Sequence, residues 1–123
     1  KKVSDKVVEF SNFSRNVNTP VVGDNIFVRE SGIGIDLVMN QPLAMFAMNP
    51  PLIGHKPGVV LGKKSGLRSI EVKLQELNIS VEEEHNQEIL QVVKQESIKL
   101  KRNISDEEFI EIVNRFKTVA ATN

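Results

Sequence analysis

The chain of 123 residues contains no cysteine, no tryptophan and no tyrosine. Without cysteine it has no disulfide, no thiol nucleophile and no zinc site built on thiolates. Without tyrosine it has no phenol for proton transfer, so its six phenylalanines act only as apolar side chains. Sixteen basic residues balance sixteen acidic ones. Because proteins that bind nucleic acid usually carry a basic excess, no nucleic-acid partner is expected.

Long apolar runs are also missing. No run approaches the ~20 residues of a membrane span, and the first residues do not have the form of a signal peptide. We therefore expect a cytoplasmic protein with no membrane partner. The two histidines, His55 and His85, lie in different segments, and neither has the spacing of a metal-ligand cluster. No metal site is expected within the chain.

Apolar residues recur at helical spacing at both ends of the chain. A helix is predicted over residues 2–14, with an apolar face of Val3, Val7, Phe10 and Phe13. Three more amphipathic helices are predicted from residue 65 onward. Their apolar stripes are Leu67, Ile70, Leu74 and Leu77; Ile89, Val93 and Leu100; and Phe109, Ile112, Val113 and Phe116.

Two serines predict where the last two helices begin. A serine followed three residues later by a glutamate forms a capping box, which contributes roughly 1 kcal/mol. The two pairs are Ser80 with Glu83 and Ser105 with Glu108. Ile104 and Phe109 are also placed for a hydrophobic staple across the second cap. The last part of the chain is therefore expected to be a small three-helix bundle.

The middle of the chain is poor in regular patterns. Short extended pieces are expected at 21–22, 26–28 and 59–61, and helical turns at 35–40 and 42–48, while Asn49-Pro50-Pro51 is expected to break any helix. The predicted fold class is mainly α, with an irregular linker subdomain carrying short strands ahead of a three-helix bundle. The predicted division is 1–19 for the first helix and linker, 20–62 for the irregular subdomain and 63–123 for the bundle.

Two stretches carry candidate binding residues. In the segment Gly62–Gly66, the backbone amides at a helix start and two lysines suit a phosphate or carboxylate, with Lys63, Lys64, Ser65 and Gly66 as the anion-binding residues. The same residues also form an ordinary turn with solvated lysines, and the pattern does not separate the two. In the segment Gly23–Asp36, the charges of Arg29, Glu30 and Asp36 lie close to glycines. They are either paired with one another or directed at a ligand.

The sequences of residues 21–36, VVGDNIFVRESGIGID, and 60–66, VLGKKSG, resemble the region after the barrel in 2-isopropylmalate, homocitrate and citramalate synthases. That family typically has VGENAFTHESGIHxDG and, some thirty residues on, VLGKHSGR. The resemblance implies a homodimeric acyltransferase of amino-acid biosynthesis, whose TIM barrel holds a divalent metal and condenses an acyl-CoA with a 2-oxo acid. The chain would then be the linker and helical subdomains, which embrace the partner subunit and lean over its active site.

The chain departs from the family pattern at chemically important positions. Gly34 stands where the family has a histidine that assists proton transfer, and Phe46 takes the place of a tyrosine. A glycine cannot move a proton, and a phenylalanine cannot donate a hydrogen bond. No catalytic residue is therefore expected in this chain. The residues assigned to an active-site-proximal loop are Arg29, which replaces the motif's first histidine, with Glu30, Ser31 and Asp36.

Several functions stay open on this evidence. The first is a post-barrel fragment, inactive alone, that exposes an apolar surface from its first helix and its Met-rich middle. The others are a non-catalytic regulatory or interaction subunit that docks on a separate barrel, a lyase-type relative similar to hydroxymethylglutaryl-CoA lyase, and a small anion-binding module built on Gly62–Gly66.

Overall fold

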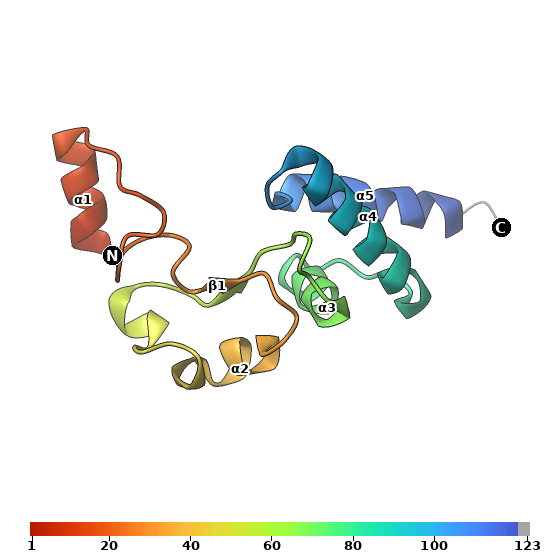
Figure 1. The fold of residues 1–123 in the computed structure, drawn as a ribbon, viewed down its shortest axis with the longest axis horizontal. Helices are drawn as coiled ribbons and strands as arrows, with labels where there is room; N and C mark the ends of the chain where they lie inside the picture. The colour runs from red at the N-terminus through yellow and green to blue at the C-terminus, as the bar shows by residue number, and fades with distance from the viewer. Residues whose placement is uncertain (121–123) are drawn as a thin grey trace. The chain divides into compact units, whose positions relative to one another are not determined.

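The computed structural model describes residues 1–120 and confirms a mainly α fold (Figure 1). The α-helices are α1 (Lys2–Ser11), α2 (Ile35–Asn40), α3 (Leu67–Glu76), α4 (Asn86–Leu100) and α5 (Asp106–Ala120). The short elements are the strands β1 (Val28–Arg29) and β2 (Gly58–Val59) and the 3-10 helices η1 (Pro42–Ala44), η2 (Pro50–Ile53) and η3 (Glu83–His85). None of the helices within these residues has the length and apolar character needed to cross a membrane.

The chain folds into two compact units that interleave along the sequence. The first contains residues 1–29 and 36–58, and the second contains residues 30–35 and the chain from residue 59 onward. The boundary falls beside β1 and within α2. The predicted division at 1–19, 20–62 and 63–123 stays a prediction.

In the first unit, α1 is attached through its polar side. Lys1 bonds to the Asp24 carboxylate, and the Arg15 guanidinium donates to Asp5 at 2.9 Å and to the Ser4 hydroxyl at 2.7 Å. These donors lower the pKa of the Asp24 and Asp5 carboxyls. The helix predicted over 2–14 is confirmed, but it ends at Ser11 because the following residue has a left-handed backbone. No residue of α1 is buried.

The apolar core of the first unit is centred on Phe27, which is 4% exposed. Its ring contacts Phe46 edge-on at a centroid distance of 5.2 Å and the tilted ring of His55 at 5.2 Å. The Gly58 N–H donates to the Phe27 carbonyl at 3.0 Å, where β1 pairs with β2. The helical turn predicted at 35–40 is confirmed as α2. No helix runs through Asn49 into Pro50, and Pro50 begins the short η2, because a proline has no N–H to lose at a first turn.

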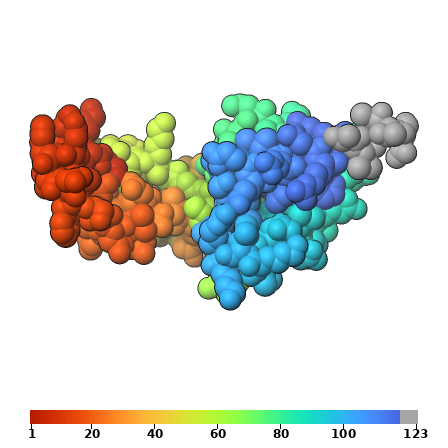
Figure 2. All heavy atoms as spheres, turned by 90° about the horizontal axis from the view of Figure 1, so that it is seen from above, coloured from red at the N-terminus to blue at the C-terminus, as the bar shows by residue number. Residues whose placement is uncertain are grey.

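In the second unit, α4 packs against both α3 and α5. In the space-filling view of Figure 2 these three helices, green to blue, lie against one another. Their facing side chains form the core, in which Ile70, Ile89, Val93, Phe109 and Val113 have no exposed surface. The apolar stripes predicted for the three helices therefore supply this core, except that Leu67 and Leu100, at the ends of two stripes, are exposed.

The two predicted capping boxes have different outcomes. At the start of α5 the Ser105 N–H donates to Glu108 Oε2 at 2.8 Å and the Glu108 N–H donates to Ser105 Oγ at 3.3 Å, which confirms the box. The box at Ser80 is wrong, because α4 begins at Asn86 and is preceded by η3. Residues 79–82 connect the end of α3 to the next helical element, so the first helical turn after them is η3, formed by residues 83–85.

Candidate functional site

The two family-like motifs meet in the second unit through Glu30. The Lys64 N–H donates to Glu30 Oε1 at 2.7 Å, and the Ser65 hydroxyl donates to the Glu30 carbonyl at 3.3 Å. We call these three residues the Glu30 clasp. Although 34 residues separate Glu30 from Lys64 along the chain, the clasp holds the loop at 30–35 directly against the turn at 62–66.

Glycines in both motifs are required by this close approach. A Cβ atom on Gly32 would lie 3.0 Å from the Cα atom of Gly66. A Cβ atom on Gly62 would lie 2.6 Å from both Glu30 Oε1 and Asn103 Oδ1. At Gly32 the facing atom is backbone, so a side chain there would push the loop and the turn apart. At Gly62 the facing atoms are side-chain oxygens, so a side chain there would instead displace the Glu30 carboxylate.

The backbone amides of Gly62, Lys64, Ser65 and Gly66 in the predicted anion site already have acceptors. Besides the Lys64 N–H in the clasp, the Gly62 N–H donates to Ser65 Oγ at 2.9 Å and the Gly66 N–H donates to Ser69 Oγ at 3.2 Å. Ser65 and Ser69 are both buried. Sequence reasoning missed Ser69, and the signal was its position three residues after Gly66, where a serine caps the start of α3. Binding of an external anion at these amides stays a prediction.

The rest of the RESGIGID stretch is divided between the units. Ser31 lies in the second unit, where its hydroxyl accepts the Ile33 N–H at 3.3 Å, and Gly34 has φ 79°, a value that favours glycine. Arg29 in β1 and Asp36 in the first turn of α2 belong to the first unit. The structure therefore joins Glu30 to the turn at 62–66 within one unit and places both Arg29 and Asp36 in the other.

The remaining candidate side chains are not grouped in a way that suits metal chemistry. Phe46 and His55 both lie against Phe27 in the first unit, and His85 lies 3.6 Å from Glu88 in the second. Within the described part of the chain, no three histidine or acidic side chains are close enough together to hold a metal ion. The hydrogen bonds of the Glu30 clasp hold the backbone of the loop at 30–35 against the turn at 62–66.

Comparison with known proteins identifies the family. A family model described as "Homocitrate synthase post-HMGL domain-like" matches residues 21–101. The chain is 43% identical to homocitrate synthase AksA of Methanothermobacter thermautotrophicus over 96 residues, which are 78% of this chain and 24% of that protein. It is 36% identical over 97 residues to a protein named homocitrate synthase, omega subunit, of Clostridium pasteurianum, covering 79% of this chain and 28% of that protein.

A 2-isopropylmalate synthase of Bacillus licheniformis is 34% identical over 119 residues, which are 96% of this chain and 23% of that protein. The chain spans about a quarter of the length of the curated relatives it matches. The match from residue 21 to 101 includes the Glu30 clasp, its glycines and the helices α3 and α4. The chain therefore belongs to the homocitrate synthase post-HMGL domain-like family.

Proposed function

We propose that this chain is the post-barrel part of an enzyme that condenses an acyl-CoA with a 2-oxo acid, as an isopropylmalate- or homocitrate-synthase-like acyltransferase. Its role is to dock on the barrel, help form the dimer and cover the partner subunit's active site. Family membership and the quarter-length match to proteins named as synthases support this proposal.

The observation that carries the proposal is the exposed apolar face of α1. Val3, Val7 and Phe10 follow one another along one side of the helix and are 79%, 59% and 82% exposed, and Phe13 just beyond it is 78% exposed. Full burial of one such side chain contributes about 1.5–3 kcal/mol. Four of them in one short segment mark a surface that another protein surface covers.

The chain supports the reaction without supplying its proton-transfer groups. Gly34 has no side chain, and Phe46 has no hydrogen-bond donor. The Glu30 carboxylate is already bonded to the Lys64 N–H at 2.7 Å. The divalent metal and the groups that move protons are therefore expected to come from the barrel.

A second arrangement has its own supporting observation. One relative bears the name homocitrate synthase, omega subunit. The barrel that this chain contacts is therefore either part of the same polypeptide or a separate one. Reading the coding sequence around these 123 residues decides between them. A barrel-coding region upstream supports the single polypeptide, and a separate barrel gene supports the subunit. If neither is found, the proposal is wrong.

The docking face is tested by binding. This chain and its barrel are produced as separate polypeptides, and their affinity is measured by isothermal titration calorimetry. Phe10→Ser, which removes an exposed ring from the face, is expected to weaken binding about tenfold, because a lost apolar contact of roughly 1.4 kcal/mol is one factor of ten. The matched control Glu9→Ser, on the neighbouring residue, is expected to bind within about twofold of the wild type. If Phe10→Ser and the wild type bind the barrel equally well, α1 does not belong to the interface.

A further inference from the structure

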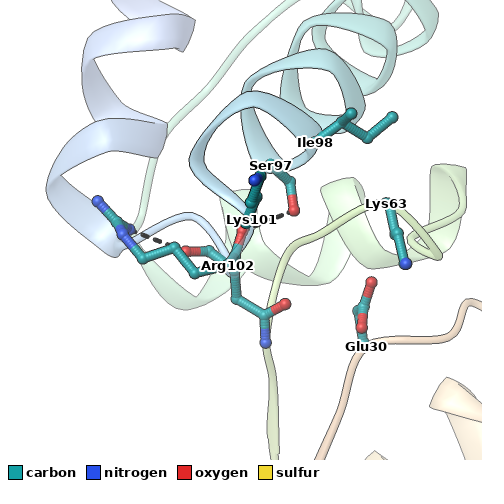
Figure 3. A pocket seen from close by; sticks show the side chains of 7 residues that line it. Glu30, Lys63, Ser97, Ile98, Lys101 and Arg102 are labelled. Carbon is teal, nitrogen blue, oxygen red and sulfur yellow. Dashed lines mark hydrogen bonds between the residues drawn. The ribbon is translucent and has the colours of Figure 1, made fainter.

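A pocket of about 300 Å³ opens in the second unit beside the Glu30 clasp. The turn at 62–66 contributes Lys63, and the end of α4 contributes Ile98 and Lys101. Figure 3 shows Glu30 and Lys63 on one side of the pocket and the residues of α4 on the other. The amides of Gly62, Lys64, Ser65 and Gly66 are bonded within the fold, so the pocket is considered through its side chains.

The fold brings basic residues together at this pocket by one backbone pairing. Leu61 and Ile104 form an antiparallel bridge, in which the Ile104 N–H donates to the Leu61 carbonyl at 2.8 Å. The bridge brings the residues just after Leu61 close to those just before Ile104. Lys63, Lys101 and Arg102 therefore line the same pocket, although almost forty residues separate Lys63 from the other two in sequence.

Only two of these three cations are available to a ligand. Arg102 donates to both carboxylate oxygens of Glu108, at 2.6 and 2.9 Å, and this pairing raises the pKa of the guanidinium. Lys63 and Lys101 are exposed, and neither forms an ion pair with any residue that the structure describes. The Glu30 carboxylate, which also lines the pocket, is held by the Lys64 N–H.

We propose that this pocket binds a small phosphate ester through Lys63 and Lys101. A phosphate monoester carries about −1.5 to −2 charge at pH 7, which matches two lysines. Ile98, which is 61% exposed on the same wall, provides an apolar contact for the organic part of the ester. Glu30 and the negative C-terminal end of α4 both oppose an anion, so the affinity is expected to be in the millimolar range. The proposal does not depend on the proposed function.

The test is a titration of the full chain followed by amide chemical shifts in two-dimensional NMR, at constant ionic strength. The probes are inorganic phosphate and adenosine 3′,5′-bisphosphate. Saturable shifts are expected at residues 62–64 and 98–103. Lys63→Gln and Lys101→Gln are each expected to weaken binding about two- to fivefold, because an exposed ion pair contributes up to about 1 kcal/mol. The double variant is expected not to saturate.

Two further variants sharpen the test. Lys64→Gln removes the same charge from the neighbouring residue, which does not line the pocket, and is expected to bind within about twofold of the wild type. Glu30→Gln keeps an acceptor for the Lys64 N–H but removes the opposing charge, so it is expected to bind the probes more tightly. Dispersed spectra of each variant confirm that it is folded.

Comparing the two probes shows whether the pocket recognises a phosphate ester or the phosphate group alone. Tighter binding of the nucleotide supports an ester that also contacts Ile98, and equal binding supports recognition of the phosphate group alone. The absence of saturable shifts with either probe, or an equal loss in Lys64→Gln and Lys63→Gln, would overturn the proposal.

Discussion

The contribution of the Glu30 clasp to stability can be worked out from its two hydrogen bonds. Glu30→Ala removes the carboxylate that accepts the Lys64 N–H at 2.7 Å and leaves the bond from the Ser65 hydroxyl to the Glu30 carbonyl at 3.3 Å. A hydrogen bond to a charged group contributes about 1.5–3 kcal/mol. Because Glu30 is only half-buried and Lys64 is exposed, water replaces part of that bond. The expected loss is therefore about 1 kcal/mol.

The measurement is urea unfolding followed by far-UV circular dichroism. Glu30→Ala is expected to lower the free energy of unfolding by about 1 kcal/mol without changing its dependence on urea concentration. Glu30→Gln keeps a neutral acceptor, so it is expected to lose about half as much. The matched control is Glu111→Ala, an exposed glutamate of α5, which is expected to stay within about 0.5 kcal/mol of the wild type. If Glu30→Ala unfolds at the same urea concentration as the wild type, the bond from the Lys64 N–H to the Glu30 carboxylate contributes nothing to stability.

Three other perturbations test the second unit. Gly32→Ala places a Cβ atom 3.0 Å from a facing backbone atom and is expected to destabilise by about 1–3 kcal/mol, measured by thermal unfolding. The Arg102 guanidinium lowers the pKa of Glu108 from 4.5 to about 2. Because the folded pKa is depressed, this stabilisation is complete above pH 4.5 and is lost as the pH falls toward 2. Glu108→Gln is expected to flatten the stability profile in that window, and Glu107→Gln is not. Phe109→Ala, which empties a fully buried site, is expected to cost about 3–5 kcal/mol by calorimetry, and Phe109→Leu, about 1 kcal/mol.

Local signals in the sequence predict the elements that depend only on neighbouring residues. The cap at Ser105 and Glu108 forms as expected because its four residues contain everything it needs. The same pattern at Ser80 and Glu83 does not form a cap, because Ser80 lies in the segment that connects the end of α3 to the next helical element. Whether a capping pattern is used thus depends on the length of the connection, which the pattern does not contain.

The contacts of the candidate site could not be predicted in the same way. Glycine-rich motifs indicate that a backbone approaches closely, but they do not say which one. The partners of Gly32 and Glu30 lie in the turn at 62–66, more than thirty residues away. The apolar face of α1 shows a similar limit. The same helical spacing is typical of a core face and of a docking face, and only the structure shows that Phe10 is exposed.

The central claim, that this chain assists a condensation it does not perform, is tested most directly by release of free CoA. The rate is measured with an acyl-CoA and a 2-oxo acid for this chain alone, for its barrel alone and for the two together. We expect no turnover by the chain, slow turnover by the barrel and a clear increase when they are combined. Turnover by the chain alone, or a barrel whose rate does not change when the chain is added, would contradict the claim.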